Sequence, residues 1–295
     1  MDAKVPVLDE EFVPLMALLQ RPGRQTLAEN GPAAARAHYS AVTSGIGPDV
    51  AIVRDVQAGG VRAREYLPES AGATIVFYHG GGWVVGGVDD YDRFARTLAS
   101  ASGMRVLSVE YRLAPEYPYP AGVDDAWAFL QAVEPLGPLF VAGDSAGGNF
   151  SAVMAQLARD IGGPRIAGQV LIYPPVAGDV PYAGKQDVPQ SIAATRKNIA
   201  AFYDYTLPAA RRHEPRFAPA LGELHGLPPA LIVTASMDLF TPEAEEYAVK
   251  LLKSGVEVRL HTAVGAPHGF LTLAPESRAT RTAMAAICRF LADHR

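Results

Sequence analysis

Residues 139–150 read Leu-Phe-Val-Ala-Gly-Asp-Ser-Ala-Gly-Gly-Asn-Phe, and this stretch decides the fold. The apolar run 139–142 is typical of a buried strand, and from about residue 147 the apolar side chains recur at helical spacing. Between strand and helix, residues 143–147 match the pattern G-x-S-x-G, with Ser145 at its centre. A serine on such a tight turn exposes its hydroxyl at the carboxyl edge of a sheet. Because the pattern also occurs by chance, it indicates either a nucleophile or a glycine-rich turn with an incidental serine.

From about residue 74 onward, apolar β-rich runs alternate with amphipathic helical stretches. Near-continuous apolar strands are typical of a parallel sheet that is covered on both faces. The predicted strands span residues 74–78, 105–109, 139–142, 169–173 and 230–234, followed by a half-exposed edge strand over 256–260. Thr241 and Pro242 are typical of a helix start, and Gly255 is placed to end that helix. The alternation predicts an α/β fold with a mostly parallel central sheet flanked by helices.

Two segments do not follow this alternation. Residues 1–45 place apolar side chains at helical spacing before any strand, and residues 176–217 form a long connection with aromatic residues at Phe202, Tyr203 and Tyr205. A long insertion in a compact sheet domain often has a function of its own, such as a lid over a site. The two segments are therefore interpreted either as a lid or as peripheral helical decoration.

A second glycine-rich loop follows the predicted strand 74–78 directly, and it reads His-Gly-Gly-Gly-Trp over residues 79–83. Successive glycines let backbone N–H groups approach a ligand without interference from Cβ atoms. Such donors can hold the oxyanion of a tetrahedral intermediate, and the N–H of Ala146, directly after the serine, supplies another. The alternative is a phosphate-binding loop, but neither G-x-x-x-x-G-K-[ST] nor G-x-G-x-x-G is present.

A serine nucleophile needs a base, and the base needs an acid that orients it. In this fold the order along the chain is serine, acid, histidine, each after a different strand. Of seven histidines, His268 lies on the loop between the last strand and the last helix, as this order requires. Asp238 follows the strand 230–234 and precedes the helix that begins near Pro242. The ordinary alternatives are a helix-capping aspartate and a surface histidine.

Composition excludes several classes of protein. The chain has 295 residues, of which 49% are hydrophobic, and a formal net charge of −5. This excludes a disordered chain, and the acidic balance argues against nucleic acid or an anionic membrane as a partner. The single cysteine, Cys288, cannot form an internal disulfide or a multi-thiolate metal site. With no membrane-spanning apolar run and no visible secretory signal, we expect a soluble, cytoplasmic protein.

Together, these motifs resemble the hormone-sensitive-lipase family of α/β-hydrolase esterases. The matching stretches are H-G-G-G-W at 79–83, Y-R-L-A-P-E at 111–116, G-D-S-A-G-G-N at 143–149, G-L-P-P-A at 226–230 and H-G-F at 268–270. The resemblance implies an α/β-hydrolase fold with Ser145 as the nucleophile, Asp238 as the acid and His268 as the base. It also implies oxyanion-hole donors at Gly80, Gly81 and Ala146.

The resemblance further implies a catalytic core over residues 46–175 and 218–295, with a helical cap from 1–45 and 176–217. It implies a small-molecule ester substrate, no metal or organic cofactor, and a possible homodimer through the exposed edge strand. The chain departs from the family at one turn. Members usually continue from the acid as Asp-Pro-Leu-Arg-Asp-Glu, whereas this chain reads Asp-Leu-Phe-Thr-Pro-Glu over 238–243, which can change the shape of the pocket.

Three hypotheses for the function follow. The first is a serine carboxylesterase that hydrolyses short-chain acyl esters through an acyl-enzyme. The second is an amidase of the formamidase type with the same fold. The third is a non-catalytic receptor, like the plant gibberellin receptors, which resemble this family and have lost the catalytic histidine. The presence of His268 favours an enzyme, but nothing in the residues separates an esterase from an amidase.

Overall fold

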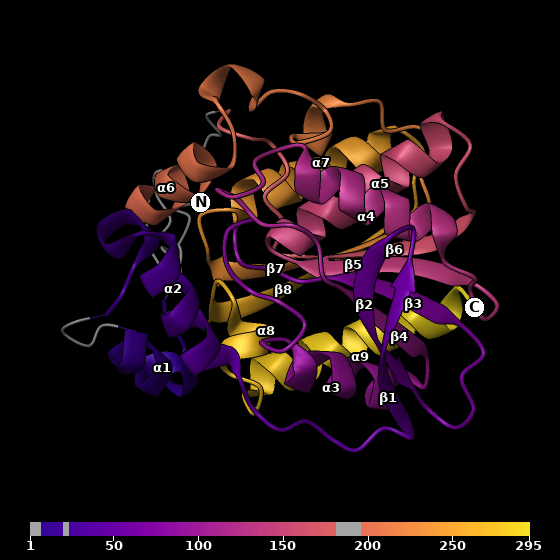
Figure 1. Cartoon of the computed structure of the whole chain (residues 1–295), viewed down its shortest axis with the longest axis horizontal. Helices are drawn as coiled ribbons and strands as arrows, with labels where there is room; N and C mark the ends of the chain where they lie inside the picture. Colours follow the sequence, from indigo (N-terminus) through magenta and orange to yellow (C-terminus); the bar gives the residue numbers. More distant parts are fainter. Residues whose placement is uncertain (1–6, 20–23, 181–195) are drawn as a thin grey trace, which may run out of the picture.

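The structure is a computed structural model that describes residues 7–19, 24–180 and 196–295 (Figure 1). Within these residues an eight-stranded sheet has the order β1-β2-β4-β3-β5-β6-β7-β8. The strands are β1 (Ile52–Ala58), β2 (Val61–Leu67), β3 (Thr74–Tyr78), β4 (Arg105–Val109), β5 (Leu139–Asp144), β6 (Ile166–Ile172), β7 (Ala230–Met237) and β8 (Val258–Pro267). The pairs β1–β2 and β2–β4 are antiparallel, and the other neighbours are parallel. The predicted α/β-hydrolase fold with a mostly parallel sheet is confirmed.

All six predicted strands are present, and β3 and β4 have the predicted bounds. The prediction missed the antiparallel hairpin β1–β2, whose strands are joined at Gly59 and Gly60. Both glycines have positive φ, 59° and 78°, as a two-residue hairpin turn of the mirror-image type requires. Strand β8 lies at the edge of the sheet, as predicted.

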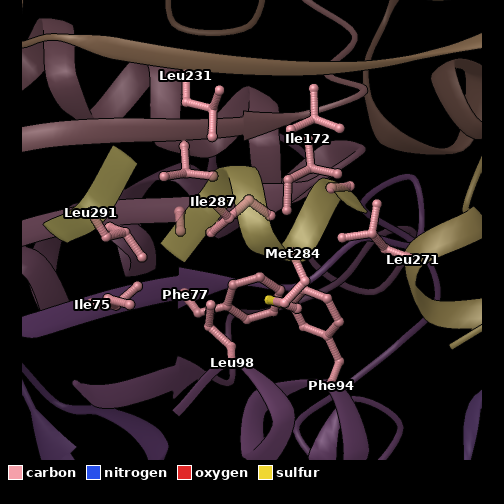
Figure 2. Packing of buried hydrophobic residues seen from close by; sticks show 14 of the residues in the cluster. Ile75, Phe77, Phe94, Leu98, Ile172, Leu231, Leu271, Met284, Ile287 and Leu291 are labelled. Carbon is pink, nitrogen blue, oxygen red and sulfur yellow. The ribbon is translucent and has the colours of Figure 1, made fainter. Parts of the chain in front are cut away.

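Helices cover both faces of the sheet. They are α3 (Asp92–Ser102), α4 (Ala121–Ala132), α5 (Ala146–Asp160), α7 (Thr241–Lys253), α8 (Phe270–Leu273) and α9 (Arg278–Asp293). In the view of Figure 1, α4, α5 and α7 lie above the sheet and α3 and α9 below it. On the lower face, Ile75 and Phe77 of β3 belong to one core cluster with Leu98 of α3 and Ile287 of α9 (Figure 2). Burial on both faces explains why the parallel strands are mostly apolar.

The two predicted cap segments contribute η1 (Glu10–Phe12), α1 (Val13–Leu19), α2 (Leu27–Thr43) and α6 (Arg196–Thr206). Helices α2 and α6 contact each other, and both lie at one side of the sheet with α1 (Figure 1). Phe12 is fully buried and packs edge-to-face on Phe270, so the start of the chain also joins the core. Residues 1–6, 20–23 and 181–195 of these segments lie outside the described residues. The division into core and cap stays a prediction.

The outer edge of β8 carries exposed apolar side chains, with Val264 77% exposed. The homodimer through this edge stays a prediction. In the part of the chain that the structure describes, no helix is both long enough and apolar enough to cross a bilayer. The cytoplasmic location likewise stays a prediction.

Candidate active site

The turn between β5 and α5 presents Ser145. Strand β5 ends at Asp144 and helix α5 begins at Ala146, and Ser145 between them has φ 51° and ψ −120°. A positive φ is uncommon in a residue other than glycine, and it signals a strained backbone that the surroundings must hold. A Cβ atom on Gly147 would overlap the carbonyl oxygen of Tyr78, so this turn needs glycine. The close approach of the turn to β3 holds the serine at the carboxyl edge of the sheet.

Two further loops at this edge bring their side chains to Ser145. His268 follows β8, and its Nε2 lies 2.9 Å from Oγ of Ser145. Asp238 follows β7, and its Oδ2 lies 2.6 Å from Nδ1 of His268. Asp238 is fully buried, and its Oδ1 accepts a hydrogen bond from the N–H of Phe240 at 3.0 Å. The structure therefore brings together the three side chains that the order of the loops predicted.

The surroundings of His268 set its charge. Burial disfavours the imidazolium ion and acts to lower the pKa of His268. The charge of Asp238, its hydrogen bond to the ring and the charge of Asp144 together outweigh burial, so the pKa of His268 lies above its ordinary value. Asp238 thus favours the protonated ring, which is the form that a base reaches when it has taken a proton.

The N–H groups of the glycine-rich loop differ in whether they already have an acceptor. The N–H of Gly80 donates to Oδ1 of Asp144 at 2.8 Å, so this amide already has an acceptor and is not available to an oxyanion. In the described part of the chain, the N–H groups of Gly81 and Gly82 have no acceptor, and both residues line the cavity beside Ser145. The N–H of Ala146 is the first of helix α5 and has no partner within the helix. Gly80, one of the three expected donors, therefore has its N–H bonded to Asp144, and the composition of the oxyanion hole stays a prediction.

Asp144 is a buried carboxylate that the sequence interpretation passed over. Burial raises its pKa to about 6, although hydrogen bonds from the Tyr91 hydroxyl at 2.9 Å and from the N–H of Gly80 act in the opposite direction. His79 is the first residue of the same loop, and its Nδ1 lies 2.7 Å from the carbonyl oxygen of Gly80. Burial lowers the pKa of His79 to about 4, so the ring is neutral at pH 7 and Nδ1 donates to that oxygen. Asp144 therefore holds the N–H of Gly80, and His79 holds its carbonyl oxygen.

A cavity of about 130 Å³ lies over Ser145. Its lining is mostly apolar and includes Leu27, Tyr39, Trp83, Ile199, Phe202, Tyr203, Phe240 and Leu273. Residues of α2 and α6 therefore line the cavity in which a substrate would meet the serine. Among residues 7–19, 24–180 and 196–295, no cluster of three or more His, Cys, Asp or Glu side chains is placed to hold a metal ion.

Comparison with known proteins identifies the family. The family model described as the alpha/beta hydrolase fold matches residues 75–272. The chain belongs to the α/β-hydrolase fold family. Its predicted resemblance to the hormone-sensitive-lipase branch is confirmed by the matching family model together with relatives named as a carboxylesterase and a carboxylic ester hydrolase.

Two curated relatives and one solved structure show the extent of the likeness. The chain is 41% identical to carboxylesterase NlhH of Mycobacterium tuberculosis, over 77% of this chain and 75% of that protein. It is 36% identical to an ethyl acetate hydrolase of Pseudomonas putida, over 70% of this chain and 68% of that protein. The structure of a Pyrobaculum calidifontis esterase superposes with a TM-score of 0.87 at 32% identity, covering 96% of this chain and 98% of that chain.

This α/β-hydrolase departs from its family at the turn after Asp238, and the structure places that departure in the pocket. Phe240 is buried and lines the cavity. Its ring meets the His268 ring edge-on at 5.4 Å between centroids, and the Tyr173 ring lies 4.8 Å from His268. The altered turn therefore places the Phe240 ring beside the imidazole, which the Tyr173 ring contacts from another loop.

Proposed function

We propose that this α/β-hydrolase is a serine carboxylesterase that acts on short-chain acyl esters through Ser145, His268 and Asp238. The observation that carries the proposal is the continuous chain of hydrogen-bond distances, 2.9 Å and 2.6 Å, from the serine to the buried carboxylate. At the serine end, this series of hydrogen bonds faces an apolar cavity that suits an acyl group. The similarity to carboxylesterases at 40–41% identity supports ester hydrolysis as the class of reaction.

In the proposed mechanism, Nε2 of His268 takes the hydroxyl proton of Ser145 while Oγ attacks the ester carbonyl carbon. Asp238 holds the proton on Nδ1, which keeps the lone pair of Nε2 directed at the serine, and stabilises the imidazolium ion that forms. His268 then returns its proton to the departing alcohol. Water attacks the acyl-enzyme by the same route and releases the carboxylic acid.

The carbonyl oxygen becomes an anion in each tetrahedral intermediate. The N–H groups of Gly81, Gly82 and Ala146 are the donors proposed to bind it, because all three lie beside Ser145 and lack an acceptor of their own in the described chain. Donors fixed in advance stabilise charge that develops only in the transition state, and the loss of one typically lowers kcat by about 10² to 10³. A Cβ atom on Gly81 or Gly82 would overlap the carbonyl oxygen of Val85 or the ring of Phe202, so these glycines let the loop pack closely and do not open space for a bulky alcohol.

The pKa of His268 predicts how activity depends on pH. Only the neutral imidazole acts as a base, and the pKa of His268 is raised above its ordinary value of about 6.5. A raised pKa means that the ring stays protonated to higher pH, so kcat/KM should fall on acidification with a midpoint above about 6.5. The charged groups that face the ring are Asp238 and Asp144, and both favour the protonated form.

The measurement is kcat/KM for a p-nitrophenyl ester from pH 5 to 9, followed at the isosbestic wavelength of p-nitrophenol. Full activity at pH 5 would contradict the role of His268 as the base. Stability of the protein over the same range, measured by circular dichroism, is the control for acid unfolding.

The volume of the cavity predicts a preference for short acyl groups. An engineered cavity of about 150 Å³ holds a molecule of benzene, and the cavity here has about 130 Å³. Within this space each buried CH₂ contributes about 0.8 kcal/mol, so kcat/KM should first rise with chain length. Beyond it, overpacking costs about 1–3 kcal/mol. We expect acetyl to hexanoyl esters to be preferred over palmitoyl esters.

The test is kcat/KM across p-nitrophenyl esters with acyl chains of two to sixteen carbons, with one tertiary-alcohol acetate added. The p-nitroanilide of the preferred acyl group is the matched comparison for amidase activity. A maximum at twelve carbons or more would refute the enclosed pocket and indicate a lipase with an open groove. An anilide hydrolysed as fast as its ester would favour the amidase.

A further inference from the structure

Helix α2 is connected to the glycine-rich loop by a series of three hydrogen bonds, of which the first is partly buried and the other two are buried. The hydroxyl of Tyr39, on α2, lies 2.7 Å from the hydroxyl of Tyr91. The Tyr91 hydroxyl donates to Oδ2 of Asp144 at 2.9 Å, and Oδ1 of Asp144 accepts from the N–H of Gly80 at 2.8 Å. Three hydrogen bonds thus link helix α2 to Gly80, the residue directly before the proposed oxyanion donor Gly81.

The direction of the protons along this chain is determined. Burial raises the pKa of Tyr39 and of Tyr91 well above the ordinary value, so both phenols are protonated at neutral pH. A phenol has one proton, and the Tyr91 hydroxyl donates it in a hydrogen bond to Oδ2 of Asp144, whose ionised carboxylate can only accept. Tyr39 must therefore donate to the oxygen of Tyr91. Each donor reinforces the next one, because a hydroxyl that accepts a hydrogen bond becomes a stronger donor.

The glycine-rich loop packs tightly against the hydrogen-bonded side chains of Asp144 and Tyr91. A Cβ atom on Gly80 would lie 2.6 Å from both Oδ2 of Asp144 and the Tyr91 hydroxyl. The loop is also closed on itself, because the carbonyl oxygen of Gly81 accepts from the N–H groups of Val84 and Val85 at 3.1 and 2.9 Å. A shift of Gly80 would therefore turn the adjacent N–H groups of the loop with it.

Helix α2 holds the far end of the same loop through Arg36, which lies one helical turn before Tyr39. The Nε of Arg36 donates to the carbonyl oxygen of Val84 at 2.8 Å. The guanidinium is itself fixed by two hydrogen bonds to Glu116, at 2.8 and 2.6 Å. The loop over residues 80–84 is thus tied to α2 at both ends.

We propose that Tyr39 and Tyr91 are positioning residues for the oxyanion hole, which act through Asp144 and Gly80 on the direction of the Gly81 and Gly82 N–H groups. This inference rests on the proposed function, since it concerns the transition state of that reaction. Donors aimed at the developing oxyanion stabilise the transition state more than the bound ester. We call the hydrogen-bonded series from Tyr39 to Gly80 the relay. Loss of the relay should therefore lower kcat and leave KM nearly unchanged.

The experiment compares Tyr39→Phe, Tyr91→Phe and the double variant, each of which keeps the ring and removes only a hydroxyl. Tyr91→Phe removes a hydrogen bond to a charged group, so kcat should fall by about 10- to 100-fold. Tyr39→Phe removes a bond between neutral groups, so kcat should fall by about three- to tenfold. If Tyr39 acts through Tyr91, the double variant has the kcat of Tyr91→Phe alone, whereas independent effects multiply.

Tyr66→Phe is the matched control. Tyr66 is fully buried, and its hydroxyl donates at 2.9 Å to Asp92, the residue directly after Tyr91, so the variant loses the same kind of bond outside the relay. Its kcat should stay within about twofold of wild type. A second measurement is the affinity for a trifluoromethyl ketone. The serine adds to its carbonyl carbon, and the carbonyl oxygen of the resulting tetrahedral adduct is an anion. The affinity for this ketone should fall in the relay variants by the same factor as kcat/KM and stay unchanged in Tyr66→Phe.

Three results would overturn the relay: an unchanged kcat in both single variants, a change confined to KM, or effects that multiply in the double variant. The proposed function fails separately. If wild-type protein neither hydrolyses esters nor forms the ketone adduct, the site itself is wrongly assigned. If the wild type is active and the hydroxyl variants equal it, only the relay is refuted.

Discussion

Ser145→Ala is expected to lower kcat for ester hydrolysis by about 10⁶ and to leave the fold intact, because the change removes the only nucleophile of the proposed mechanism. The Oγ atom of Ser145 is 2.9 Å from His268 and contributes no other hydrogen bond that the described structure contains. Alanine has the same Cβ as serine, so it meets the strained φ of 51° at a similar cost. What remains of catalysis should come from substrate binding and the oxyanion donors alone.

The measurement pairs initial rates on a short-chain p-nitrophenyl ester with mass spectrometry after treatment with a phosphonate that labels active serines. Wild-type protein should gain one adduct, on Ser145, and the variant none. Ser151→Ala is the matched control, since Ser151 lies on helix α5 directly after the turn of Ser145, is fully buried and only donates to the carbonyl oxygen of Gly147 at 2.9 Å. More than trace hydrolysis by purified Ser145→Ala would show that another residue is the nucleophile.

The parallel part of the sheet was predictable from the sequence, and the hairpin at its edge was not. Strands β3 to β7 are covered on both faces, so their residues form nearly continuous apolar runs. In the hairpin β1–β2, one face meets solvent, and charged pairs such as Arg62 with Asp55, at 2.8 Å, interrupt the apolar pattern. The signal that marks this hairpin is the pair Gly59-Gly60 between two β-rich runs.

In the candidate site, too, one part was predictable from the sequence and another was not. The order of the loops was enough to select Ser145, Asp238 and His268, because parallel strands end at one edge of the sheet and bring their following loops together. The choice of the proposed oxyanion donors depends on a contact between residues 64 positions apart, in which Asp144 accepts a hydrogen bond from the N–H of Gly80. Three adjacent glycines look alike in a sequence, so only the packing of the loop distinguishes Gly80 from the two glycines after it.

Asp238→Asn is expected to lower kcat by about 10⁴ near neutral pH. The carboxylate lies 2.6 Å from Nδ1 of His268 and can only accept there, so it fixes the proton on Nδ1 and leaves Nε2 free to act as the base. An amide can present its NH₂ group to Nδ1 instead, which places the proton on Nε2, toward Ser145. It also carries no charge, and the imidazolium ion formed during attack then loses its stabilising partner.

The change in charge gives a second readout with a definite sign. Asp238 raises the pKa of His268, so its replacement by an amide should lower that pKa and move the acidic limb of kcat/KM to lower pH than in wild type. A merely structural loss would reduce the rate without moving the limb. The measurement is therefore a full pH profile of Asp238→Asn beside that of the wild type.

Asp125→Asn is the control for removing a carboxylate from an ion pair. Asp125 is buried and binds Arg112 through both oxygens, at 2.8 and 2.7 Å, away from the cavity over Ser145. Its variant should lose stability in thermal unfolding and keep kcat within a few-fold of wild type, since it touches no reacting group. If Asp238→Asn instead behaved like Asp125→Asn, Asp144 would be the next candidate, because it is the other carboxylate whose charge raises the pKa of His268. A near-wild-type rate in Asp238→Asn would therefore move the role of the acid into the nucleophile turn itself.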